Sequence, residues 1–379
     1  MKLTCDLSHI VSLFRNSAAL LEAKTTLPIS GHILLTAQHN LLTIQATDLE
    51  TGFQGSCEAT IQTPGTVTLP GKKTLEILRE LSGETVEITQ ADNQNVKIQS
   101  GGSKFTIQGL PPNEFPSIHG LDTPPELDLP REDFETLLRE VIPSIGEDQS
   151  RFILNTVRAE ISGTTTPKLR LVSTNGHRLS MAEKSMGIWR SKPESDHKIM
   201  IAKKAATLIV KLLGETDQDT VGVGITKNLL VLQIGSVRLA SRLVDGNYPN
   251  YNQVIPKKLA AQMEIDGPQF AEALRRVAVM AESASPAVDL TLSADGLKIE
   301  TQNPNLGTAN ETLAATIGVE RLEARLNARY LIESIQTAPS KNIRFHMEDG
   351  LKPCVLTNGD VSRWLTVIMP INKPNKAAA

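Results

Sequence analysis

The feature that most constrains this chain is an amphipathic helix pattern that occurs three times. In residues 6–21, Leu7, Ile10, Val11 and Phe14 follow the i, i+3, i+4, i+7 spacing of one helical face. The same four positions recur 127 residues later, and again after a further 136. They are Phe134, Leu137, Leu138 and Val141, and then Phe270, Ala273, Leu274 and Val277. A chain with such a period is expected to fold as repeated units, each with its own core.

A second helix pattern, a turn and an exit recur in the same order. The helix patterns begin at Pro70, Ala202 and Asn327. The turns end strand-like runs at 42–50, 169–177 and 297–305, and the exits are aromatic-proline or methionine-proline pairs at 115–116, 248–249 and 369–370. We therefore predict an α+β fold with three similar domains of antiparallel sheet and two helices each. The predicted domains are 1–123, 124–252 and 253–372, followed by a disordered tail at 373–379.

The composition fits this architecture and gives no sign of a metal site, a disulfide framework or an overall attraction to nucleic acid. Apolar residues make up 40% of the 379 residues and aromatic residues only 3%, which favours regular aliphatic packing. The formal net charge of −3 gives no overall attraction to nucleic acid or membrane. The spacing of Cys5, Cys57 and Cys354 fits neither a zinc site nor a disulfide framework. Buried thiols in a reducing cytoplasm are expected, since the chain also shows no signal-peptide pattern or long apolar run.

The stretch STNGHRLS, residues 173–180, is the place where an active site would be sought. Its His177 corresponds to Glu50 in the first repeat and Asn305 in the third, so the turn recurs without the histidine. No nucleophile elbow, phosphate loop or metal-ligand spacing of histidines accompanies it. We expect a protein that is not an enzyme and uses no metal or cofactor. A partner-binding turn and a plain structural turn both remain open for residues 173–180.

Basic residues recur on the second helices. Lys72 and Arg79 are seven apart and share a helical face, and Lys204 and Lys211 hold the same positions 132 residues later. Such a stripe is either an ordinary solvated face or a surface for phosphate groups, which would bind independently of base sequence.

These features together resemble one known family. The motifs that carry the resemblance are KTTLPISGHILL (24–35), ATDLE (46–50), FPSI (115–118), STNGHRLS (173–180), LVDGNYPNY (243–251) and VIMPIN (367–372). Over residues 1–372 the chain resembles the bacterial sliding clamps, the beta subunits of the replicative DNA polymerase. The resemblance implies a three-domain crescent, two of which close head to tail into a ring around duplex DNA. Such a ring tethers the polymerase and confers processivity.

The resemblance also implies a pocket between the middle and C-terminal domains. It would bind short hydrophobic peptides of the replicative polymerase, the clamp loader and repair polymerases or ligase. The residues implied are Arg151, Leu154, Thr174, Gly176, His177, Arg178, Leu179, Pro249, Val254, Asn327, Tyr330, Val367, Met369 and Pro370. Gln253 and Asp148 depart from the family pattern, which affects the expected selectivity and DNA contact. Alternatively, the apolar members are simply interdomain core.

The resemblance and the basic stripe together give the remaining expectations. The expected DNA-facing residues are Lys24, Lys72, Arg79, Gln149, Phe152, Lys203, Lys204 and Lys211. For a homodimer interface we expect edge strands at 103–109 and 296–302, with the helix that contains Val279 and Met280 packed beside them. The residues are Lys104, Phe105, Ile107, Val279, Met280, Lys298 and Glu300. Two alternatives stay open: an enzyme that uses His177 and Arg178, and an interaction scaffold that never encircles DNA.

Overall fold

The computed structural model describes residues 1–21, 27–191, 195–257, 259, 261–282 and 285–372. In these ranges the chain forms six α-helices, two for each predicted repeat. They are α1 (Leu7–Ala18), α2 (Gly71–Glu80), α3 (Arg131–Val141), α4 (Lys203–Gly214), α5 (Gly267–Ala278) and α6 (Ala328–Gln336). All six predicted helices are confirmed. The tail predicted at 373–379 lies outside the described residues.

Side-chain caps set where three of these helices begin. The carboxylates of Asp6 and Asp266 accept backbone N–H groups in the first turns of α1 and α5, at 3.0 Å and 2.9 Å. Asn327 does the same for α6, accepting from the amides of Arg329 and Tyr330. Such caps satisfy amides that have no partner within the helix. Asp6 and Asp266 each stand directly before the first residue of their helix, so α1 and α5 begin in the same way.

The contacts divide the chain into two compact units, which cut through the middle repeat. Unit 1 comprises Met1–Glu135, Gly187–Pro193 and Lys204–Leu243, and unit 2 comprises Thr136–Met186, Glu194–Lys203 and Val244–Ala379. The division falls within α3 and after the first residue of α4. The domain boundaries at 123 and 252 remain a prediction.

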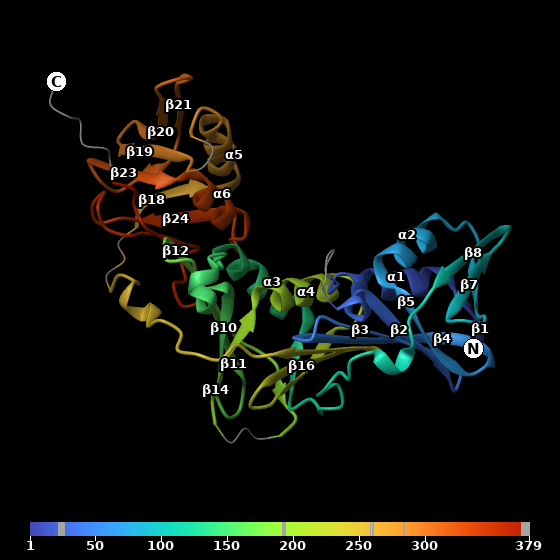
Figure 1. Cartoon of the computed structure of the whole chain (residues 1–379). Coiled ribbons are helices and arrows are strands. Elements are labelled where there is room, and N and C mark those ends of the chain that lie inside the picture. Colours follow the sequence, from blue (N-terminus) through green and yellow to red (C-terminus); the bar gives the residue numbers. More distant parts are fainter. Residues whose placement is uncertain (22–26, 192–194, 258, 260, 283–284, 373–379) are drawn as a thin grey trace. The chain divides into compact units, whose positions relative to one another are not determined.

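Unit 1 contains a thirteen-stranded antiparallel sheet within the described residues. Its main path is β13-β9-β15-β16-β17-β4-β1-β6-β7-β8, and β2, β3 and β5 branch from β4. The strands of the path are β13 (Ile188–Trp189), β9 (Leu127–Pro130), β15 (Thr220–Ile225), β16 (Leu229–Ile234), β17 (Val237–Arg242), β4 (Thr51–Thr63), β1 (Lys2–Asp6), β6 (Thr85–Gln90), β7 (Asn95–Ser100) and β8 (Ser103–Gln108). The branch strands are β2 (His32–Gln38), β3 (Leu41–Thr47) and β5 (Gly65–Pro70). Figure 1 shows α1 and α2 side by side over this sheet, and α1 packs on β3 and β4.

Unit 2 contains a nine-stranded and a four-stranded antiparallel sheet among the residues described. The orders are β14-β10-β11-β12-β26-β25-β24-β18-β22 and β21-β20-β19-β23. The first comprises β14 (His197–Ala202), β10 (Thr156–Ser162), β11 (Lys168–Thr174), β12 (Arg178–Ser185), β26 (Trp364–Ile368), β25 (Cys354–Thr357), β24 (Asn342–His346), β18 (Ala261–Asp266) and β22 (Thr316–Ile317). The second comprises β21 (Gly307–Leu313), β20 (Gly296–Asn303), β19 (Ala287–Ser293) and β23 (Arg321–Asn327). Here α5 packs on α6 and on β20 and β21 (Figure 1).

Each unit has one seam where strands from distant parts of the chain pair. In unit 1, β17 pairs with the start of β4, with Ser241 opposite Thr51. In unit 2, β26 pairs with the start of β12, with Ile368 opposite Arg178. Both partners are shifted by the same 127 residues from one seam to the other. We call these the first seam and the second seam.

The helix positions predicted to be apolar form the cores. Ile10, Phe14, Leu137, Leu274 and Leu331 are fully buried. Val11 and Ala338 are the exceptions in the pattern, because both are only half-buried. With few aromatic residues available, aliphatic side chains on one helix face and on alternating strand positions exclude water from the sheet.

One strand prediction is wrong. Residues 296–303 form β20, which pairs with β19 on one side and β21 on the other. Lys298 and Glu300 therefore lie on an interior strand, and β21 provides the edge of that sheet. The difference cannot be predicted from the sequence, because edge strands and interior strands with mixed polar residues have similar patterns.

Candidate functional site

The turn at residues 174–178 is held by side-chain hydrogen bonds. The Thr174 hydroxyl donates to the Arg178 carbonyl at 2.6 Å and accepts from the Gly176 amide. Asn175 Oδ1 accepts the amides of His177 and Arg178 at 2.9 Å and 3.0 Å. Gly176 has φ +88°, a left-handed conformation that favours glycine. The roles of Thr174 and Gly176 are therefore to shape the turn, and His177 projects from it into solvent.

The Arg178 guanidinium is buried beneath this turn, with only 6% of the residue exposed. Its Nη2 donates to the Pro143 carbonyl and to Glu333, the latter at 2.5 Å, and its plane lies 4.4 Å from the centre of the Tyr330 ring. Burial lowers the pKa of Arg178, and Glu333 opposes that shift. Among the described residues, Nε and Nη1 have no hydrogen-bond partner. Two buried donors thus remain open for an acceptor.

Leu179 and Val367 face each other across the second seam and belong to a buried core cluster with Val172, Met181, Tyr251, Val355 and Leu365. Leu179 and Val367 thus lie in the core beneath the 174–178 turn, which agrees with the alternative that these two residues are core. Met369 continues beyond β26, where its amide donates to the His177 carbonyl at 2.9 Å. Met369 and Val254 are the apolar predicted residues that stay more than a third exposed at this place.

A cavity of about 230 Å³ lies beside the turn. It is lined by Gly146, Glu147, Asp148, Arg151, Leu154, Asn155, Asn175 and His177. Of the predicted pocket residues, it brings together Arg151, Leu154 and His177. The Asp148 carboxylate already has hydrogen-bond partners. It caps the 3-10 helix Gln149–Asn155 by accepting hydrogen bonds from the amide and the hydroxyl of Ser150. These bonds also lower the pKa of Asp148.

The remaining predicted pocket residues lie around the same seam with less specific roles. Pro249 is exposed and Pro370 half-buried. Asn327 is buried and serves as the cap of α6, placing Tyr330 one turn away under Arg178. Gln253 is an exposed residue of the short 3-10 helix Tyr251–Gln253.

Three helices of unit 1 bring basic side chains together. Lys211 on α4 has its pKa lowered by burial and by the positive charges of Arg15 on α1 and Arg79 on α2. Its Nζ donates to the Arg15 carbonyl at 3.0 Å. Glu215 lies beside them: it pairs with Arg15 at 3.7 Å and opposes the lowering of the Lys211 pKa, so part of this positive charge is already compensated. Lys72 and Arg79 lie exposed on α2, whereas Thr74 and Leu78 on the other face are buried.

Two predicted DNA-facing lysines are engaged with acids. Lys203 pairs with Glu147 at 2.7 Å, and Lys204 pairs with Asp48 at 2.5 Å while donating to the Leu20 carbonyl. Gln149 and Phe152 are exposed, and Lys24 lies outside the described residues. The basic surface of unit 1 thus centres on Arg15, Arg79 and Lys211, of which the sequence reasoning missed Arg15.

Comparison with known proteins now decides the family. Models of the DNA polymerase III beta subunit match the chain as its N-terminal domain at 1–119, its central domain at 128–250 and its C-terminal domain at 252–372. The chain belongs to the DNA polymerase III beta subunit family. It is a sliding clamp, a non-catalytic processivity factor of DNA replication.

Full-length relatives and solved structures agree. The chain is 28% identical to the beta sliding clamp of Vibrio cholerae and 27% identical to that of Escherichia coli, each covering 98% of this chain and 100% of the relative. The sliding clamp of Bartonella birtlesii bound to griselimycin superposes with a TM-score of 0.91 at 28% identity, over 98% and 100% of the two chains. The clamp of Bacillus subtilis shares the fold, with a TM-score of 0.90 at 21% identity over 99% and 100%.

Among the described residues, the strands of six or seven residues that end sheets include β8, β14, β21 and β23. β8 ends the sheet of unit 1 and β21 ends the four-stranded sheet of unit 2. Phe105 on β8 is partly exposed, while Val279, directly after α5, is 75% exposed. Met280 lies next to the β20–β21 turn, where its Cε would be 3.7 Å from a Cβ on Gly307. Lys104 and Ile107 complete the β8 edge, on which Lys104 is exposed and Ile107 half-buried.

Glu333 and Pro143 are the functional residues that sequence reasoning missed at the second seam. Glu333 lies three residues after Tyr330 on α6, so the two share a helix face, but its partner Arg178 is 155 residues away in sequence. No cluster of metal-binding side chains occurs among the described residues. Nor is any described helix long and apolar enough to span a membrane.

Proposed function

We propose that two copies of this clamp close head to tail into a ring around duplex DNA. We further propose that partner proteins bind the exposed region beside His177 through short hydrophobic peptides. The observation that carries the ring is the pair of free edges β8 and β21, one at the end of a sheet in each unit. An edge strand leaves backbone N–H and C=O groups unpaired, and head-to-tail pairing of the unlike edges β8 and β21 would satisfy both of these edges in a closed ring.

The proposed interface adds side chains to backbone pairing. Phe105 and Ile107 on β8 of one protomer would pack against Val279 and Met280 of the other, with Lys104 near Glu311 on the partner's edge. Glu311 already pairs with Arg276 at 2.7 Å, so the charge contact is shared. Because β20 is paired on both sides, the backbone of Lys298 and Glu300 cannot pair with a partner strand. Only their side chains could contribute to the proposed interface.

Sedimentation velocity of the full chain tests the ring. The Phe105→Arg and Val279→Asp variants are expected to sediment as monomers at concentrations where the unaltered chain is a dimer. Ile188→Asp is the matched control, because Ile188 is equally apolar and exposed on β13 at the opposite end of the unit 1 sheet. A dimer that survives both interface substitutions would sink this arrangement.

The basic cluster supports encirclement without base recognition. Contacts from Arg15, Lys72, Arg79 and Lys211 to phosphates would be independent of sequence and weakened by salt, which suits a sliding protein. Retention on nicked circular DNA after loading is the measurement. A Lys72→Glu/Arg79→Glu variant should be lost faster, whereas Lys2→Glu/Lys97→Glu, which changes the same charge on strands, should not. Equal retention of both variants would favour a scaffold that does not encircle DNA.

Peptide binding rests on the geometry of the second seam. Met369 and Val254 offer exposed apolar contact there, which suits a short hydrophobic peptide. A fluorescent peptide with leucine and phenylalanine anchors should bind the chain, and Met369→Asp should weaken it roughly tenfold or more. The control is Leu49→Asp at the equivalent turn of the first seam. A chemical activity that is lost in His177→Ala while peptide binding is intact would instead favour the enzyme alternative.

A further inference from the structure

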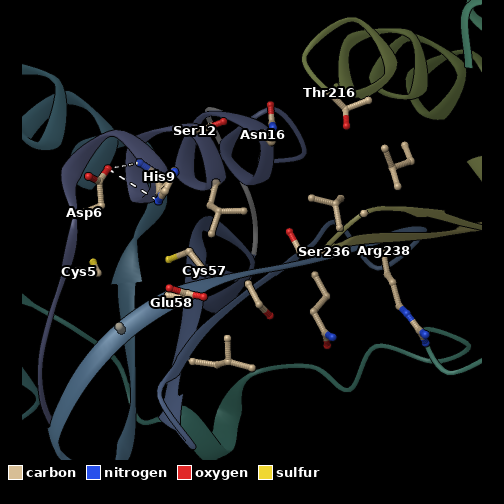
Figure 2. A pocket seen from close by; sticks show the side chains of 18 of the residues that line it. Cys5, Asp6, His9, Ser12, Asn16, Cys57, Glu58, Thr216, Ser236 and Arg238 are labelled. Atoms are coloured by element: carbon tan, nitrogen blue, oxygen red, sulfur yellow. Dashed lines mark hydrogen bonds and ion pairs between the residues drawn. The ribbon is translucent and has the colours of Figure 1, made fainter. Parts of the chain in front are cut away.

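A groove of about 1560 Å³ lies in unit 1 beside α1, away from the second seam. It is lined by residues of β1, α1, β4 and the β16–β17 hairpin (Figure 2). Two of the three cysteines, Cys5 and Cys57, are among its lining residues. Nothing in the clamp function described above uses them.

The two cysteines sit on neighbouring strands. Cys5 on β1 lies opposite Ala59 on β4, so Cys57, two residues along β4, faces the same side of the sheet. Cys5 is buried and Cys57 is half-buried, contrary to the expectation that every thiol is buried. Figure 2 shows the Cys57 sulfur pointing toward Cys5, and each thiol shifts the pKa of the other.

We propose that Cys5 and Cys57 form a redox-active thiol pair, in which Cys57 attacks a small disulfide that enters the groove and Cys5 then closes an internal disulfide. Cys57 is the attacking thiol because it is the member of the pair with partial access to solvent. Cys5 is the resolving thiol because it is enclosed and its nearest sulfur is Cys57.

The surroundings of the two thiols agree with this division of roles, which rests on the access of Cys57 to the groove. The neighbouring Cys5 thiol lowers the pKa of Cys57, while burial and Asp6 oppose the shift. Cys57 and burial raise the pKa of Cys5. Since the thiolate is the nucleophile, the first attack belongs to Cys57.

The reaction balances with glutathione disulfide as the oxidant. The Cys57 thiolate attacks one sulfur of glutathione disulfide, forming a mixed disulfide and releasing a glutathione thiolate. Cys5 then loses its proton and attacks the Cys57 sulfur, releasing the second glutathione thiolate. Two protein thiols are oxidised, one disulfide is reduced to two glutathione molecules, and these take up the two protons.

The strand geometry makes the product reversible. Diagonal residues on antiparallel strands have Cα atoms roughly 7–8 Å apart. An unstrained disulfide needs about 4.4–6.8 Å. Since β1 and β4 are already paired directly, the bond can form only through a local change of their register or twist. A disulfide that holds strands under strain is readily reduced. The pair is therefore suited to reversible modification and poorly suited to permanent cross-linking.

The test is intact-mass analysis of the folded full chain after incubation with glutathione disulfide. The expected product has lost two hydrogen masses, contains a Cys5–Cys57 peptide on non-reducing digestion and reverts with dithiothreitol. Cys57→Ser should abolish the reaction, and Cys5→Ser should stop at one glutathione adduct on residue 57. Cys354→Ser should change nothing, since Cys354 is fully buried on β25 and burial raises its pKa to about 12.

Two results would overturn the proposal. One is a folded chain that stays fully reduced while the same chain in guanidinium reacts, because the groove would then not admit the disulfide. The other is a Cys57→Ser variant that is modified at Cys5 as fast as the unaltered chain, because the order of attack would then be wrong. Neither result depends on ring closure or DNA binding.

Discussion

The two seams have the same backbone and different side chains. At both, a five-residue turn precedes the joining strand: 47–51 at the first seam and 174–178 at the second. Thr47 donates to the Thr51 carbonyl at 3.0 Å, as Thr174 does to Arg178, and Asp48 accepts the amides of residues 50 and 51, as Asn175 does for 177 and 178. The repeat therefore preserves the turn down to single hydrogen bonds.

The side chains that follow differ in size and in what covers them. At the first seam Gly52 is covered by Ile118, and Ile118 and Leu229 pack on Leu121, Val231 and Ala240. At the second, Leu179 replaces the glycine and Arg178 replaces Thr51. The first seam is thus filled by its own chain, whereas the second keeps a cavity and exposed apolar side chains. The turn therefore supplies the same frame at both seams, and the side chains on and around it decide whether the seam is filled or keeps a cavity.

The largest expected effect on stability comes from a buried ion pair that the second seam has and the first seam lacks. Arg363 holds Glu140 through two hydrogen bonds of 2.7 Å and 2.8 Å, and Glu140 is 1% exposed. Its equivalents at the first seam are the uncharged Ser236 and Leu13. Arg363→Ala should lower the free energy of unfolding by about 3–5 kcal/mol, because it removes both of these hydrogen bonds from a buried carboxylate. Urea denaturation measures it, and Glu140→Leu/Arg363→Met should recover most of the loss. A single-variant loss below about 1 kcal/mol would show that the pair is not needed at this seam.

The next effect tests the filling of the first seam. A Cβ on Gly52 would overlap Cγ2 of Ile118, so Gly52→Ala should destabilise by about 1–3 kcal/mol through overpacking. In an Ile118→Ala background the same change should be nearly neutral. A double-mutant cycle gives this coupling energy directly. Additive effects would mean that the Ile118 side chain moves aside to admit the new methyl group, and that it does not define the packing of the first seam.

A smaller effect concerns the tip of each turn. Leu49 has φ +76°, where the second seam has Gly176 at φ +88°. Left-handed backbone costs a non-glycine residue about 1–2 kcal/mol, and glycine loses part of that gain through its freer unfolded chain. Leu49→Gly should therefore stabilise the chain by up to about 1 kcal/mol, and Gly176→Leu should destabilise it. Thermal unfolding of both variants measures the two effects. A lower melting temperature for Leu49→Gly, or a higher one for Gly176→Leu, would contradict the prediction.

The sequence was sufficient for the elements that repeat, because helical spacing, caps and turn residues act locally. The six helices, the turns and the Phe-Pro and Tyr-Pro exits all follow from such signals. The partners of individual side chains were not predictable in this way. Lys203 and Lys204 carried the right charge and spacing for phosphates, but Glu147 and Asp48, far away in sequence, neutralise them.

The same limit explains the edge strand and the pocket. Whether β20 or β21 ends a sheet depends on which strand pairs last, and both have mixed polarity. Arg178 was expected in the pocket from the family resemblance, but its contact with Glu333 depends on two elements meeting in space. Sequence periodicity predicts which face of an element is buried, and leaves open which partner buries it.

The smallest effect distinguishes the acceptors that hold the two turns. Asp48→Asn keeps both turn hydrogen bonds and removes only the ion pair with Lys204, whose side chain is partly exposed, so the loss should stay under about 1 kcal/mol. Asn175→Asp keeps the second turn and gains no such pair, so its effect should lie within about 0.5 kcal/mol. Unfolding at low and at about 1 M salt should show the first loss shrinking, because salt screens surface pairs. The opposite result would be equal losses of stability in Asp48→Asn and Asn175→Asp that do not change with salt. The ion pair between Asp48 and Lys204 would then not contribute, and the losses would come from the change of acceptor within each turn.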